Sequence, residues 1–187
     1  QAVIKCIEEV ISSLKQPIAI CFSSVMHSLI AMGKDGNSLN HMMTWADARS
    51  EKITTNVIES PMAESLYNKT GTPLHPMSPL FKIMWIRENQ PEIFNQTEKF
   101  ISIKEYIWYR LFKQYQIDYS VASGTGLFDI ETLQWNKDSL ELAGISEKHL
   151  SEIVNTCYCR KDLCLKASAV LDISSGTSFI IGASDGC

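Results

Sequence analysis

The spacing of apolar residues predicts helices and strands in both terminal parts of the chain. Apolar side chains recur at helical intervals over residues 2–15, which predicts an amphipathic helix. After Pro17, the continuous apolar run 18–22 has the length of a strand, and such a run is typical of a strand covered on both faces. A second apolar run, 178–183, predicts another strand close to the end of the sequence.

Between these two predicted strands the pattern first indicates a hairpin and a helix. Segments 29–32 and 39–44 flank the glycine-containing stretch 33–37, as the two arms of a hairpin flank its turn. Residues 48–59 then follow helical periodicity, and Asp47 is placed to cap that helix.

The middle of the chain has a mostly helical pattern. Ser102 suits a helix N-cap and Gly144 suits a C-terminal stop. Aromatic residues such as Trp85, Tyr106, Trp108 and Phe112 lie within these helical patterns, so we expect them to pack in the core. The predicted helices are residues 62–69, 79–89, 91–97, 103–115, 137–143 and 147–154.

Together these elements indicate an α/β fold. We interpret the chain as one sheet domain interrupted at about residues 60–155 by a mostly helical insertion, with the last strand returning to the sheet. Neither end of the sequence is typical of a complete domain: no strand precedes the first helix, and the chain stops two residues after Asp185. We therefore expect residues 1–187 to be a fragment of a larger domain.

Bulk composition narrows the function classes. The chain has 187 residues, 45% of them hydrophobic and 20% charged, which is ordinary globular composition. A net charge of −4 without any basic run argues against binding to nucleic acid. No apolar stretch approaches the roughly 20 residues that a membrane span needs, and no signal peptide is visible. These features predict a cytoplasmic protein.

The six cysteines do not suggest a metal site. Cys6 and Cys21 lie in apolar segments that resemble core. Cys157, Cys159 and Cys164 have a spacing that suits zinc poorly. We expect buried free thiols in a reducing compartment.

Asp185 is the strongest candidate for a chemical role. The last apolar run ends in Gly182-Ala183-Ser184, with the Asp185 carboxylate at its tip beside another glycine. Such an arrangement presents a general base at the carboxyl end of a strand, on backbone compact enough for a substrate to approach. The same string is also typical of a plain turn.

Two further segments carry candidate binding residues. Met26 and His27 follow the first strand, at the edge where open α/β sheets bind ligands, although a structural histidine is the alternative. Trp45, Asp47 and Arg49 alternate, so in extended backbone they would share one face. An indole wall, a carboxylate acceptor and a guanidinium fork suit a polyol, whereas a buried Trp with a surface Asp–Arg pair is the alternative.

Other polar loops are less informative on their own. A turn-rich stretch at 71–79 leads into a helix that carries Lys82, for which a solvated side chain is the default. The loop at 118–129 contains small residues that suggest close backbone packing more than catalysis. No glycine-rich phosphate loop and no Gly-x-Ser-x-Gly elbow is present.

These motifs, taken in order, resemble those of the FGGY carbohydrate kinases and, within them, the gluconate kinases. The Thr-Trp-Ala-Asp-x-Arg-Ser and His-Pro-Met forms favour the gluconate kinases over the xylulose kinases, in which Asn-Asp commonly follows the Trp. The matching segments are 23–27, 44–50, 70–77 with Lys82 and Trp85, 118–123 with Phe128, Asp129 and Trp135, and 182–185.

The resemblance implies a ribonuclease-H-like, actin-like fold in which a sugar or sugar acid is held between two domains. Asp185 would be the catalytic base, and the C6 hydroxyl of gluconate would receive the γ-phosphoryl group of ATP with Mg²⁺. Arg49, Lys82 or His27 would meet the gluconate carboxylate. The substrate-binding positions that the resemblance implies are Met26, His27, Trp45, Asp47, Arg49, Met77 and Lys82.

The resemblance also implies what lies outside this sequence. The family's first strands, with a phosphate loop, would precede Gln1, and the domain that binds adenosine would follow Cys187. ATP and Mg²⁺ would therefore be bound mainly by other parts of the enzyme, and the fragment alone is expected to be inactive. A homodimer is compatible with the resemblance.

Three alternatives remain open at this point. A xylulose or other pentulose kinase would keep the mechanism and change the substrate. A non-catalytic sugar-binding protein of the same fold would be expected to have lost the base, but Asp185 is present. A plain α/β interaction module would bind no ligand at these residues.

Overall fold

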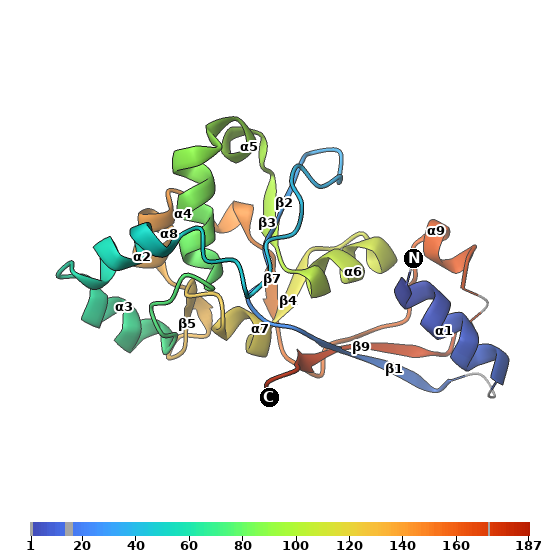
Figure 1. Ribbon diagram of the computed structural model, residues 1–187. Helices are drawn as coiled ribbons and strands as arrows, with labels where there is room; N and C mark the ends of the chain where they lie inside the picture. The colour runs from blue at the N-terminus through green and yellow to red at the C-terminus, as the bar shows by residue number, and fades with distance from the viewer. Residues whose placement is uncertain (1, 14–16, 172) are drawn as a thin grey trace.

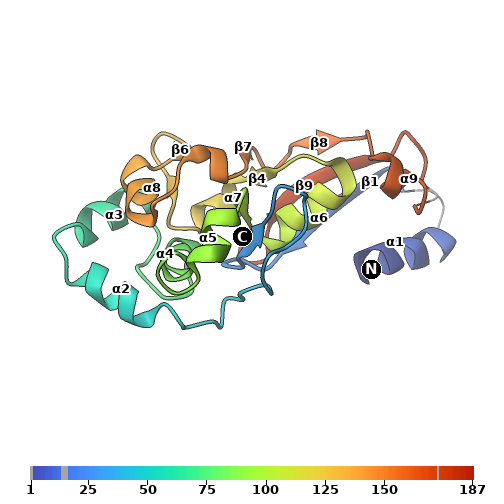
Figure 2. The ribbon, with the colours of Figure 1, turned by 90° about the horizontal axis from the view of Figure 1, so that it is seen from above.

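The computed structural model describes residues 2–13, 17–171 and 173–187, which form an elongated mixed α/β domain (Figures 1 and 2). The helices are α1 Ala2–Ser13, α2 Glu51–Ile58, α3 Ala63–Thr70, α4 Pro79–Asn89, α5 Pro91–Gln96, α6 Ile103–Phe112, α7 Tyr119–Ser123, α8 Lys137–Ala143 and α9 Leu165–Ser168. The strands are β1 Ala19–Ser24, β2 Ile30–Met32, β3 Lys99–Ile101, β4 Gln116–Asp118, β5 Phe128–Asp129, β6 Gln134–Trp135, β7 Glu152–Val154, β8 Cys159–Arg160 and β9 Ser178–Ser184.

A sheet with strand order β1-β9-β8 links the two ends of the described chain. β1 and β9 run parallel, with Ala19 opposite Ser178 and Ser24 opposite Ser184, whereas β8 runs antiparallel to β9. Helices α1 and α9 lie beside this sheet at one end of the molecule, and α2 to α5 and α8 gather at the other end (Figure 1). The predicted return of the last strand to the first sheet is therefore confirmed.

Two separate hydrophobic clusters match this division. One cluster joins α6 to the β1-β9-β8 sheet, and at its centre the fully buried Trp108 packs against Phe112, with ring centroids 4.4 Å apart. The other fills the helical end of the molecule with side chains from α2, α3, α4 and α8. Trp108 and Phe112 are core residues as predicted, whereas Trp85 and Tyr106 are only partly buried.

Helix α6 connects the two ends and begins at a reciprocal cap. The Ser102 hydroxyl accepts from the Glu105 backbone N–H at 3.3 Å, and the Glu105 carboxylate accepts from the Ser102 N–H at 2.6 Å. The second Glu105 oxygen accepts from the Ser151 hydroxyl at 2.5 Å, which ties the start of α6 to the segment before β7. Ser102 is thus the N-cap that the sequence predicted, and burial raises the pKa of Glu105 to about 7.

Several predicted boundaries are wrong for identifiable reasons. The helix predicted to reach residue 115 ends at Phe112, because Lys113 adopts a left-handed conformation with φ of 57°. The helix predicted at 147–154 is a short 3₁₀ turn followed by β7, which pairs in parallel with β4. The predicted hairpin is present as isolated antiparallel bridges that join Leu29 to Met43 and Met32 to Ser38. The regular ladder of β2, which the sequence did not predict, is with β3.

Burial also corrects two expectations. β1 is not covered on both faces, because its residues alternate between exposed and half-buried at the edge of the described sheet. The free cysteines are not buried thiols: Cys6, Cys21, Cys157, Cys159 and Cys187 are exposed and Cys164 is half-buried. Among the described residues, every helix falls short of the length or the hydropathy that a transmembrane segment needs.

Gly182 makes the alignment of β1 and β9 possible. Its φ is 69°, and a Cβ atom there would lie 2.0 Å from the Phe22 carbonyl oxygen. The register of the two strands shifts at the same level, between Cys21 and Ser23. Only glycine combines this backbone conformation with so close an approach of the neighbouring strand.

We therefore expect Gly182→Ala to lower the free energy of unfolding by at least about 2 kcal/mol, because it adds left-handed strain and a backbone clash. Gly176→Ala is the matched control, since a Cβ at that position would make only an ordinary 3.5 Å contact with Ser174. Urea unfolding of both variants measures the difference. Equal stability of the two variants would contradict this role of Gly182.

Candidate functional site

The carboxyl ends of β1 and β9 bring two predicted segments to one edge of the sheet. Ser24 lies opposite Ser184, and the Asp185 N–H donates to the Ser24 carbonyl oxygen at 2.9 Å. Met26 and His27 therefore leave β1 at the edge where Asp185 leaves β9. In open α/β sheets this edge is where ligands bind.

Met26 and His27 pack against Gly124, the C-cap residue directly after α7. The His27 Nδ1 lies 2.8 Å from the Gly124 carbonyl oxygen, and a Cβ at Gly124 would lie 2.5 Å from the Met26 Cε. Because a carbonyl oxygen only accepts, Nδ1 carries the hydrogen of the neutral ring, which leaves Nε2 as an acceptor. His27 is also one of the few non-glycine residues with positive φ, at 59°.

The surroundings of His27 disfavour the protonated form of its ring. Partial burial is the largest influence and lowers the pKa of the imidazole, while the bond to Gly124 acts in the opposite direction. The Lys82 and His75 charges lower the His27 pKa as well, and the Asp185 carboxylate raises it. Lys82, His75 and Asp185 therefore all lie close enough to influence the His27 ring.

Lys82 is buried rather than solvated, with 0% of its surface exposed. Its Nζ donates to the carbonyl oxygens of His27 at 2.5 Å and Thr44 at 2.7 Å. Lys82 therefore ties the segment after β1 to the segment that carries Trp45, Asp47 and Arg49. Its ammonium group thus fixes the backbone of both segments without being exposed itself.

Asp47 and Arg49 form a close pair beside Trp85. The Arg49 Nε lies 2.8 Å from Asp47 Oδ1, and its Nη2 lies 2.7 Å from Oδ2. The guanidinium also stacks 4.8 Å from the centroid of the Trp85 ring. Partial burial favours a neutral Asp47, but the hydrogen bonds from Arg49 outweigh it and lower the pKa of the carboxyl.

Asp47 does not cap α2 as predicted. Its Oδ1 accepts from the Arg49 backbone N–H at 3.2 Å, two residues before the helix begins. Ser50 occupies the N-cap position, and its hydroxyl donates to the Pro76 carbonyl oxygen at 2.9 Å. The carboxylate is thus used to fix the Arg49 fork instead of a helix end.

Trp45 and Met77 lie on two loops of this region. Trp45 is 61% exposed, and within the described part of the chain no hydrogen bond or cation–π contact joins its side chain to Asp47 or Arg49. Met77 is half-buried, and its N–H donates to the His75 Nδ1 at 3.2 Å. The loop that carries Met77 is also anchored to α7 by the Thr72 hydroxyl, which donates to the Ser123 carbonyl oxygen at 2.6 Å.

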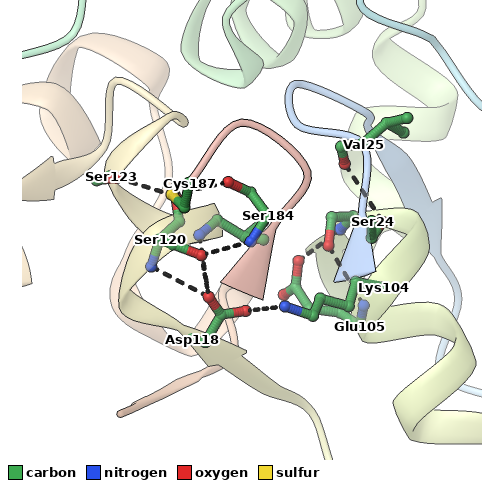
Figure 3. Close-up of polar contacts among 11 residues, drawn as sticks. Ser24, Val25, Lys104, Glu105, Asp118, Ser120, Ser123, Ser184 and Cys187 are labelled. Atoms are coloured by element: carbon green, nitrogen blue, oxygen red, sulfur yellow. Dashed lines mark hydrogen bonds and ion pairs between the residues drawn. The ribbon is translucent and has the colours of Figure 1, made fainter. Parts of the chain in front are cut away.

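Two groups near Asp185 were not singled out in the sequence. Gly124 provides the space for Met26, and its signal was the small-residue run in the loop at 118–129. Asp118 and Ser120 form hydrogen bonds that lead to the backbone of Ser184 (Figure 3). An Asp directly before a helical segment is a typical N-cap, and this signal could have indicated the cluster.

The described residues contain no group of three or more His, Cys, Asp and Glu side chains that could hold a metal ion. What they offer is the exposed Asp185 carboxylate and the His27 imidazole at the sheet edge, and the Arg49 guanidinium on the loop that Lys82 ties to His27. This set suits recognition of hydroxyl groups and of one anionic group, together with transfer of one proton.

Lys82 predicts a pH dependence of stability. Burial lowers its pKa from 10.5 to about 8, because the ammonium group loses water. Between these values the unfolded chain holds a proton that the folded protein has released, so the stability of the folded state rises with pH. A neutral amine keeps two N–H donors, which match the two carbonyl oxygens.

We expect the unfolding free energy of the wild type to gain roughly 2 kcal/mol over that of Lys82→Met between about pH 7.5 and pH 10. Urea unfolding of both proteins at several pH values measures this difference, and the other titrating groups cancel in the comparison. A difference in unfolding free energy that stays constant or shrinks with rising pH would show that the pKa of Lys82 is not lowered in the folded protein.

Sequence and structure comparisons give a consistent picture. All of residues 1–187 match the family model described as the FGGY family of carbohydrate kinases, N-terminal domain. The chain is 46% identical over 176 residues to a gluconokinase from Bacillus licheniformis. That alignment covers 92% of this chain and 34% of the relative, so the chain spans about a third of the length of that protein.

Two solved structures from Lactobacillus acidophilus share the fold. One is described as gluconate kinase and the other as ligand-bound xylulose kinase, and each superposes with a TM-score of 0.95 at 35% sequence identity. Each comparison covers 99% of this chain and 38% of the solved chain. The likeness therefore extends over the whole described fold.

Proposed function

Because the chain belongs to the FGGY family of carbohydrate kinases, we propose that it forms the sugar-binding side of an ATP-dependent kinase that converts gluconate to 6-phosphogluconate. The observation that carries this proposal is the position of Asp185, held at the end of β9 beside the Met26–His27 segment. The activity is proposed for the complete gene product, since the relatives are about three times longer than this chain. In that protein the sheet would belong to a ribonuclease-H-like domain.

Asp185 would act as the general base. Its side chain is exposed, and within the described part of the chain its carboxylate makes no ion pair or hydrogen bond. It is therefore free to accept the proton of the substrate's C6 hydroxyl as that oxygen attacks the γ-phosphorus of ATP and ADP leaves. Phosphoryl transfer depends mainly on positioning, which a carboxylate fixed by strand pairing supplies.

The charges of the site favour an anionic substrate held by Arg49. Burial lowers the pKa of His27 and so disfavours its cationic form, and Lys82 already donates to two backbone carbonyl oxygens. Arg49 is 43% exposed, and its contact with Asp47 leaves part of the guanidinium fork unused. We therefore assign the gluconate carboxylate to Arg49, among the three cations that the sequence suggested.

The remaining predicted residues would bind the polyol chain. Asp47 can accept from hydroxyls, and the exposed indole of Trp45 can cover the C–H face of the substrate. Met26 and Met77 would supply apolar contacts, and the His27 Nε2 would accept from a hydroxyl. Lys82 would contribute through the backbone that it fixes, in place of direct contact.

ATP and Mg²⁺ are implied by the family. The described residues hold no group of three or more His, Cys, Asp and Glu side chains that could bind the metal ion by themselves. Mg²⁺ is commonly held by one or two carboxylates together with substrate phosphates, so it would be bound mainly by other parts of the enzyme.

Xylulose is the second candidate substrate. One solved structure with a TM-score of 0.95 is described as a xylulose kinase, and xylulose carries no charge. A neutral substrate would leave the free part of the Arg49 fork without an anionic partner. A non-catalytic sugar-binding protein is less consistent with the unpaired Asp185 carboxylate.

Asp185→Asn in the complete gene product tests the base. We expect kcat for gluconate to fall by about 10²- to 10⁴-fold with little change in KM, since the carboxylate acts on the proton in the transition state. A coupled assay for ADP with gluconate, xylulose, glycerol and ribulose in parallel measures both the effect and the specificity. Asp138→Asn, an exposed carboxylate on α8 that pairs with Lys69, is the control. Full activity of Asp185→Asn would remove the base assignment.

Arg49→Gln tests the substrate class. We expect it to raise KM for gluconate by tenfold or more and to leave KM for a neutral sugar nearly unchanged, because a charged hydrogen bond is lost only with the anion. Lys69→Gln, which removes an exposed cation on α3, serves as the matched control. An equal effect of Arg49→Gln on both substrates would assign Arg49 to the fold and not to the carboxylate.

A further inference from the structure

A buried network connects α6 and α7 to the backbone beside Asp185. Lys104 on α6 and Asp118 at the end of β4 form an ion pair 2.7 Å long, with 3% and 0% of their side chains exposed. The second Asp118 oxygen accepts from the Ser120 hydroxyl at 2.5 Å and from the backbone N–H groups of Ser120 and Val121. Asp118 is therefore both the N-cap of α7 and the partner of a buried cation.

The Ser120 hydroxyl connects Asp118 to the backbone of β9. Its oxygen accepts from the Ser184 backbone N–H at 2.8 Å, as Figure 3 shows. A hydroxyl has one hydrogen, and because a carboxylate can only accept, that hydrogen must point at Asp118. The Ser120 lone pairs are thus left for Ser184, one residue before the proposed base.

The strand geometry explains why Ser184 needs this partner. Successive N–H groups of a strand point to opposite edges, and the Asp185 N–H already donates to Ser24 on β1. The Ser184 N–H faces the other edge, where the hydrogen bonds from β9 to the β8 side end at Gly182, whose N–H donates to the Thr156 carbonyl oxygen. Ser184 is buried, so without Ser120 its N–H would lack a partner.

We infer that Ser120, oriented by the Asp118–Lys104 pair, is a positioning residue for the Asp185 base. β1 holds Asp185 from one edge through Ser24, and α7 holds the preceding residue from the other edge through Ser120. The carboxylate itself is exposed, so its place depends on these two backbone anchors. This inference rests on the proposed role of Asp185.

The test uses kinetics of the complete gene product. Ser120→Ala removes the acceptor, and we expect kcat for the sugar substrate to fall by about 10- to 100-fold while KM stays nearly constant, because a small displacement of the base affects only the chemical step. Ser120→Thr keeps the hydroxyl and is expected to retain activity within about threefold of the wild type. Ser123→Ala is the matched control, since this serine lies on the same helix and its hydroxyl donates only to the Ser120 carbonyl oxygen.

A double-mutant cycle separates positioning from a general structural effect. If Ser120 acts through Asp185, Ser120→Ala should not lower the residual rate of Asp185→Asn any further. Circular dichroism and the thermal midpoint of each variant check folding. Should Ser120→Ala fail to fold, Ser120→Cys keeps the side chain but offers a weak acceptor, and the same loss of kcat at constant KM is expected.

The outcomes distinguish this inference from the proposed function. An inactive Asp185→Asn together with an unchanged kcat in Ser120→Ala would overturn the inference and leave the base in place. The inference is also overturned if Ser123→Ala loses as much kcat, if Ser120→Ala changes KM alone, or if its effect persists undiminished in Asp185→Asn. Full activity of Asp185→Asn would instead overturn the proposed base, and the positioning role with it.

Discussion

The parallel pairing of β1 with β9 is the constraint on which the rest of the site depends. It joins segments from opposite ends of the described chain, and the turn of the backbone at Gly182 sets their register. The hydrogen bond from the Asp185 N–H to the Ser24 carbonyl oxygen then fixes which side chains meet at the sheet edge. A different register would carry the carboxylate away from Met26 and His27.

Two buried lysines, Lys82 and Lys104, stabilise the segments next to this pair of strands. Lys82 binds the carbonyl oxygens of His27 and Thr44, so it joins the β1 edge to the loop with the Asp47–Arg49 pair. Lys104 pairs with Asp118 and so stabilises the start of α7. Both lysines are buried, and each binds protein groups instead of water. Their role is therefore structural. The exposed residues Trp45, Arg49 and Asp185 then remain available to contact a ligand.

The sequence predicted the elements with strong local signals and missed those set by distant contacts. The spans of α4 and α8 and the cap at Ser102 were correct, because proline, glycine and a capping pair define them locally. The strand β7 was read as helix, because its pairing with β4 comes from tertiary structure. Motif order identified the family, whereas the burial of Lys82 and the link from Ser120 to Ser184 depend on contacts between residues far apart in sequence.

The most direct test of the central claim is a crystal structure of the complete gene product with gluconate and a non-hydrolysable ATP analogue. We expect an Asp185 carboxylate oxygen within about 2.6–3.2 Å of the substrate's C6 hydroxyl, on the side opposite the γ-phosphorus. The Arg49 guanidinium should contact the substrate carboxylate in the same complex. A C6 hydroxyl bound by another group, with Asp185 out of reach, would contradict the account.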